Sequence, residues 1–156
     1  MPNTKAVGVA FADPEFESVS VTGAVTAASA SVTGAVSAGS VSASTVTASG
    51  SLVIKSATVA ATGNSQGTAA AVAAGFTLVT AADATKGVVL PAASAGLVVI
   101  IKNADAANAV LKVYPASGDA INALAANASY DMAAKTSMLL VAYDATTWYT
   151  VPLLAS

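Results

Sequence analysis

Residues 18–54 contain no charged side chain, and an eight-residue unit within them recurs at an offset of 11 residues. The unit reads Ser-Val-Thr-Gly-Ala-Val-Thr-Ala at residues 20–27 and Ser-Val-Thr-Gly-Ala-Val-Ser-Ala at residues 31–38. Repetition of this kind is typical of a unit that cannot bury its apolar face alone and needs neighbours. The structure that this segment can adopt therefore limits what the whole chain can be.

Two periodicities compete within the repeat. Val, Ala and Gly alternate with Ser and Thr over about nine residues, which is a strand pattern. Valines spaced by four and three residues also trace a helical seam, and an 11-residue repeat is a known supercoil period. A helix would have to contain Gly23, Gly34, Gly39 and Gly50, and each glycine costs about 1 kcal/mol relative to alanine. The composition therefore favours extended β structure over a coiled coil.

A single copy of such a ribbon would have open, uncharged edges and side chains too small to form a thick core. We therefore expect several identical chains to wind together, and three-fold closure is the simplest arrangement for an intertwined fibre. The predicted trimer interface consists of valines: Val21, Val25, Val32, Val36, Val41 and Val46. The alternative is a disordered Ser/Ala/Thr linker, against which the valine alternation and the missing charge both argue.

Composition divides the chain into three zones. Residues 1–17 form an irregular N-terminal arm with two aromatic residues, Phe11 and Phe16, which are candidates for contact with a partner. Residues 18–67 are the repetitive trimerisation region. Residues 68–156 hold most of the large apolar side chains and are predicted to form a C-terminal β-domain. The predicted fold is thus all-β, with an intertwined trimeric ribbon or prism followed by a small β-sandwich or jelly-roll-like domain.

The C-terminal zone contains short apolar runs separated by turn residues. The predicted strands are Phe76–Thr80, Gly87–Leu90, Leu97–Lys102, Val110–Tyr114, Tyr130–Met132, Ser137–Tyr143 and Trp148–Val151. Residues 68–75 are alanine-rich and offer a short helix that ends at Gly75 as an alternative local structure.

The chain has no His and no Cys, and its six basic residues are all Lys. Thiol chemistry, zinc sites built on Cys or His, and Ser-His-Asp hydrolysis therefore lack a necessary part. We expect no enzyme, no cofactor and no metal. The lysines are scattered singly, so no nucleic-acid partner is expected. No run of apolar residues is long enough to cross a membrane, and no signal peptide is visible, which predicts synthesis in a cytoplasm.

Three groups of side chains deserve a structural test. Asn103, Asp105 and Asn108 could offer oxygens to a cation, but turn formation is the better interpretation. Asp13, Glu15 and Glu17 could act as paired carboxylates, but a solvated acidic arm is the better interpretation. Tyr130, Tyr143, Trp148 and Tyr149 could form a sugar-binding platform, but aromatic residues in strands more often lie in a core or subunit interface.

The repeated Ser-Val-Thr-Gly-Ala-Val unit resembles repeats in trimeric fibre and spike proteins of tailed bacteriophages. The stretch from Gly87-Val-Val-Leu-Pro through Leu-Lys-Val-Tyr-Pro-Ala-Ser-Gly-Asp to Asn127 is similar to a β-domain of head decoration and head-fibre proteins. The resemblance covers residues from about 18 to 151 and brings no catalytic residues with it.

The resemblance implies a homotrimer on the virion surface. The length of the chain favours a capsid decoration, or cement, protein bound to the major capsid protein, and Phe11 and Phe16 are the expected capsid contacts. The alternative is a short tail fibre or receptor-binding adhesin. A small enzyme acting through carboxylates is a third possibility, for which no acid/base motif is found.

Overall fold

The computed structural model describes residues 22–73 and 75–151 of the 156-residue chain. The chain divides into two units, of which the first ends at Thr47 and the second begins at Ala48. The C-terminal unit contains every strand found in residues 22–73 and 75–151. Within the described residues there is no helix, so none that could cross a membrane.

Residues 22–55 form no strand within a single chain, and every one of them is exposed. The exposure is large for the valines predicted to form the trimer interface. Those described are between 60% and 76% exposed: Val25, Val32, Val36, Val41 and Val46. Their neighbours are mostly Ala, Ser, Thr and Gly, which are too small to cover them. Val21 lies outside the described residues, as do Phe11 and Phe16.

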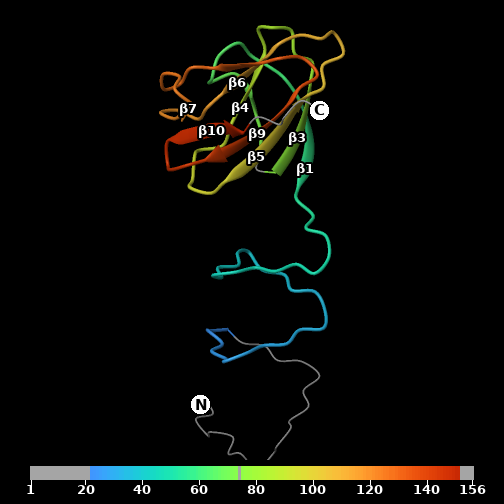
Figure 1. Ribbon diagram of the computed structural model, residues 1–156, viewed down its shortest axis with the longest axis vertical. Coiled ribbons are helices and arrows are strands. Elements are labelled where there is room, and N and C mark those ends of the chain that lie inside the picture. The colour runs from blue at the N-terminus through green and yellow to red at the C-terminus, as the bar shows by residue number, and fades with distance from the viewer. Residues whose placement is uncertain (1–21, 74, 152–156) are drawn as a thin grey trace, which may run out of the picture. The chain divides into compact units, whose positions relative to one another are not determined.

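The described part of the chain contains ten strands. They are β1 (Ser56–Ala60), β2 (Ala70–Ala71), β3 (Gly75–Thr80), β4 (Gly87–Val89), β5 (Val98–Asn103), β6 (Leu111–Tyr114), β7 (Ala120–Ile121), β8 (Tyr130–Met132), β9 (Ser137–Ala142) and β10 (Thr147–Val151). Sheet A has the order β1-β3-β5-β9-β10-β7, and sheet B has the order β2-β4-β6-β8. Figure 1 shows β1, β3, β5, β9 and β10 side by side.

The first six strands alternate between the two sheets. β1, β3 and β5 pair in parallel in sheet A, while β2, β4 and β6 pair in parallel in sheet B. The chain therefore stacks in a solenoid-like manner. Each coil has one strand in each sheet, so the first coil holds β1 and β2, the second β3 and β4, and the third β5 and β6. It then reverses, because β8 pairs antiparallel to β6 and β9 pairs antiparallel to β5.

One apolar core is shared by both sheets. Sheet A contributes Val79, Val99, Ile101, Leu140 and Trp148, and sheet B contributes Val88, Leu111, Val113 and Met132, all of them almost fully buried. The inward residues alternate along each strand with residues of the outer face, as the period of two requires. Complete burial of one aliphatic side chain of this size contributes about 1.5–3 kcal/mol relative to leaving it exposed.

The all-β prediction is confirmed for the described residues. All seven predicted strands are present, and no end differs by more than one residue. The alternative helix over residues 68–75 is wrong, because Ala70–Ala71 forms β2 and pairs with β4. The predicted strands omitted β1, β2 and β7. The expected sandwich or jelly-roll topology is not confirmed, since the first coils pair in parallel.

Candidate interaction surface

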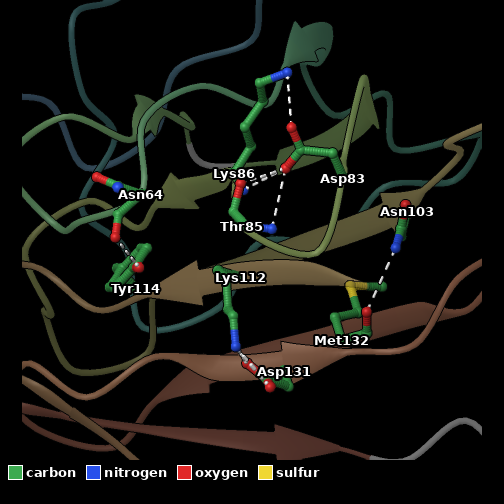
Figure 2. A network of polar contacts seen from close by, with 9 residues as sticks. All are labelled: Asn64, Asp83, Thr85, Lys86, Asn103, Lys112, Tyr114, Asp131 and Met132. Carbon is green, nitrogen blue, oxygen red and sulfur yellow. Dashed lines mark hydrogen bonds and ion pairs between the residues drawn. The ribbon is translucent and has the colours of Figure 1, made fainter. Parts of the chain in front are cut away.

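The outer face of sheet B is polar. Lys112 on β6 and Asp131 on β8 lie opposite each other in the register, and the Lys112 Nζ approaches both carboxylate oxygens of Asp131 at 2.8 Å. Tyr114, two residues along β6, donates its hydroxyl hydrogen to the carbonyl oxygen of Asn64 at 2.9 Å. Figure 2 shows both contacts. This face therefore satisfies its polar groups within the chain and resembles an ordinary solvated surface.

The outer face of sheet A is apolar. Phe76, Ile100, Leu139 and Val151 stand opposite one another across four strands, and Val98, Val141 and Tyr149 form the adjacent row. Their chain neighbours point into the core. Among the six strands of sheet A, all of which the structure describes, Lys102 is the one charged residue. We call Phe76, Val98, Ile100, Leu139, Val141, Tyr149 and Val151 the apolar face.

A pocket opens at the β1 end of the apolar face. It has a volume of about 320 Å³ and is lined by Ile54, Lys55, Gly75, Val98 and Ile100. Directly before it in the chain, Leu52 and Val53 are 80% and 89% exposed. The apolar surface of the sheet is thus continuous with the exposed apolar residues that lead into β1.

Strand β1 is an uncharged edge of sheet A, and among the described residues it pairs with β3 alone. The Lys55 carbonyl accepts the N–H of Phe76 at 2.9 Å, and the Ala61 N–H donates to the Thr80 carbonyl at 2.7 Å. Because backbone groups of alternate residues point to opposite sides of a strand, the intervening Ser56, Thr58 and Ala60 direct theirs away from the sheet. An edge of this kind is a template for another strand unless charge or a covering segment blocks it.

The aromatic residues do not form one platform. Trp148 is fully buried in the core, and its Nε1 has no hydrogen-bond partner among the described residues. Tyr130 is half-buried and packs against the core from sheet B. Tyr143 and Tyr149 remain outside, with their ring centroids 6.0 Å apart in an edge-to-face arrangement. The core interpretation is confirmed for Trp148, whereas Tyr143 and Tyr149 are available to a partner.

Asn103, Asp105 and Asn108 take part in turns, as the turn interpretation predicted. Asn103 is buried, and its Nδ2 donates to the carbonyl oxygens of Ala109 at 2.9 Å and Met132 at 3.4 Å (Figure 2). Its Oδ1 accepts the N–H of Asp105, and Asp105 in turn accepts the N–H of Ala109. Asn108 takes a positive φ of 59°, which asparagine tolerates better than most residues. Asn103 Oδ1 and Asp105 Oδ2 are therefore occupied by backbone donors.

Two further aspartates fix turns at the surface. The Thr85 hydroxyl and Lys86, which also forms an ion pair of 2.9 Å, hold the pKa of Asp83 far below its ordinary value (Figure 2). The backbone N–H of Thr146 lowers the pKa of Asp144 in the same way. No group of three or more acidic, His or Cys side chains in the described residues is arranged to hold a metal ion. Asp13, Glu15 and Glu17 lie outside those residues.

The predicted sites and the apolar face belong to different parts of the chain. Sequence reasoning placed the association surface in residues 18–67 and did not identify the outer face of sheet A. A signal for it exists, because Leu97-Val98-Val99-Ile100-Ile101 is apolar at every position and a strand with one solvated face would alternate. No protein-family model, curated protein or solved structure matches this chain.

Proposed function

We propose that this chain is a non-catalytic structural protein that decorates the head of a tailed bacteriophage as a homotrimer. It would bind the major capsid protein at the capsid surface and stabilise the shell after synthesis in the host cytoplasm. One observation carries the proposal: residues 22–55 have no charge before Lys55, no strand pairing and no buried residue within a single chain. A segment this rich in exposed valine is expected to find its partners in other copies.

In this proposal the part of the 18–67 region that precedes β1 winds with the same segment of two other chains into a β ribbon or prism, because residues 56–60 already pair with β3 of their own chain. Valines face the common axis, while Ser and Thr face water. The N-terminal arm, with Phe11 and Phe16, reaches the capsid. Three weak contacts joined in one body bind far more tightly than one contact, which suits a protein that bridges capsid subunits. The small β-domain of each chain completes the trimer.

The first experiment is the native mass by light scattering. We expect three times the chain mass of 14.9 kDa. Val32→Asp should abolish assembly and give aggregates, because folding and association of an exposed apolar ribbon are coupled. Thr33→Asp places the same charge on the opposite side of the ribbon and should preserve the trimer. A soluble, folded monomer from Val32→Asp would show that the ribbon does not hold the chains together.

The capsid role needs its own experiment. Purified protein should co-sediment with bare capsids and raise the temperature at which they open. Removal of residues 1–17 should abolish that binding and leave the trimer intact. If the shortened protein bound capsids as well as the full chain, the arm would have no role in attachment.

A receptor-binding adhesin is the second candidate, and the exposed pair Tyr143 and Tyr149 favours it. Tyrosine rings open to solvent on one side are suited to stacking on sugars. Binding of the purified protein to host cells, lost on Tyr143→Ala, would support this function. Trp148→Ala is unsuitable for the test, because Trp148 is a core residue.

A further inference from the structure

The two sheets of the C-terminal unit present opposite surfaces. The outer face of sheet B carries an ion pair between Lys112 and Asp131, whereas the side chains of the apolar face of sheet A are hydrocarbon apart from the Tyr149 hydroxyl. On that face Val98, Tyr149 and Val151 are 42–48% exposed. Contiguous exposed apolar patches on a soluble domain mark interaction sites. The asymmetry indicates that the outer face of sheet A contacts a partner and that the outer face of sheet B does not.

The position of the apolar face points to the partner. It joins the pocket lined by Ile54 and Val98, and the pocket joins the exposed Leu52 and Val53. These residues continue directly from the valine-rich segment that is proposed to associate with other copies. A surface continuous with one association segment is most simply covered by the same partner.

We propose that the apolar face of sheet A is buried against a second copy of this chain. The inference rests on the proposed self-association and extends it from residues 18–54 to the C-terminal unit. In a homotrimer each copy can turn this face toward the common three-fold axis, where it meets the same face of the other two copies. Lys102 does not oppose this arrangement, since its Nζ turns to the Lys135 carbonyl oxygen at the end of the strand.

Chemical labelling tests the proposal on the full chain, which contains no cysteine. Val98→Cys places one thiol on the apolar face, and Ala71→Cys places one on the exposed outer side of sheet B as the matched control. In the native protein a maleimide reagent should modify the Val98→Cys thiol at least about tenfold more slowly than the Ala71→Cys thiol. A partner contact that stabilises the covered state by about 1.4 kcal/mol is enough to give that factor. Both thiols should react equally in denaturant.

The native mass of each labelled sample separates the possible failures. A trimer in which both thiols react at the same rate overturns the covered face and leaves the proposed function standing. A monomer overturns self-association itself. Slow labelling in a monomer would assign the cover to residues 152–156 of the same chain. Fast labelling that slows only on capsids would assign it to the capsid protein, and both results contradict a second copy.

A charge substitution provides an independent readout. Val98→Glu should lower the trimer fraction at least about tenfold at a fixed low concentration, because an unpaired carboxylate would be buried between copies. Val89→Glu makes the same change on the outer face of sheet B and should leave the mass unchanged. Circular dichroism confirms that both variants remain folded. Equal masses for the two folded variants would refute the proposal.

Discussion

Tyr114 packs its ring against Gly87 on the outer face of sheet B. A β-carbon added at Gly87 would stand 2.7 Å from Tyr114 Cε2 and 2.6 Å from the Lys112 carbonyl oxygen, closer than real contacts allow. The strand cannot easily move away, because Gly87 exchanges backbone hydrogen bonds of 3.1 Å with Thr62. Glycine is therefore required at residue 87, where β4 of the second coil pairs with β6 of the third.

Gly87→Ala should destabilise the C-terminal unit by about 1–3 kcal/mol, the usual cost of overpacking. Urea unfolding followed by circular dichroism measures the change. Gly67→Ala is the matched control, because an added β-carbon there meets nothing within 4 Å and the backbone is not left-handed. Equal midpoints for the two variants would contradict this account of Gly87.

Asp119 is a buried carboxylate whose Oδ2 accepts the N–H of Ala93 at 2.9 Å. Asp119→Ala leaves that donor unpaired in the interior and should cost about 1–3 kcal/mol. Asp131→Ala removes an exposed carboxylate and should cost only about 0–1 kcal/mol. Unfolding free energies that rank the two variants the other way would show that the Ala93 contact contributes little.

Trp148 contributes through packing alone. Trp148→Ala should cost about 3–5 kcal/mol because it opens a large cavity in the shared core. Trp148→Phe should cost clearly less, since Nε1 has no hydrogen-bond partner to lose among the described residues. Tyr143→Ala, which removes a ring that is 72% exposed and lies outside the apolar face, is the control for loss of a ring. Thermal unfolding of the three variants distinguishes them, and a Trp148→Phe variant as unstable as Trp148→Ala would refute the argument.

Acid should weaken the turns that Asp83 and Asp144 hold. Their hydrogen bonds lower both pKa values below the ordinary 3.8, so the folded state favours the ionised carboxylates. Their contribution to stability is present above that value and is lost as the pH falls through the lowered values. The double variant Asp83→Ala, Asp144→Ala should have a lower melting temperature than the wild type near neutral pH. The difference between the two melting temperatures, the gap, should narrow between about pH 4 and about pH 2. A gap that stays constant over this range would contradict the expectation.

Local pattern was sufficient to predict the longer strands. Runs such as Val98–Lys102 and Ser137–Ala142 alternate or are fully apolar and end at turn residues, so their strand character is encoded nearby. Strand β1 was missed because Ser-Ala-Thr-Val-Ala contains only one large apolar residue, and its strand form depends on β3 beside it. Strands β2 and β7 have two residues each, which is too short for any pattern.

Pairing direction and surface character were harder to predict. Nothing local distinguishes parallel from antiparallel pairing, because the choice depends on contacts between residues far apart in the chain. The apolar face was overlooked for a related reason. An apolar run such as Val98–Ile101 indicates burial on both sides, but the sequence does not say whether the second side is covered by the same chain. The cation candidates take part in turns, and of the platform candidates Trp148 and Tyr130 pack in or against the core while Tyr143 and Tyr149 stay exposed.

The coils of the C-terminal unit have one further consequence, which concerns how such a chain can change over time. In sheet A, β3 pairs with β1 and β5 pairs with β3. In sheet B, β4 pairs with β2 and β6 pairs with β4. Duplication of a single coil would present the same parallel edges to its neighbours and leave the rest of the stack undisturbed. Proteins descended from this architecture should therefore differ in length by whole coils, and insertions that shift only part of a coil should be rare.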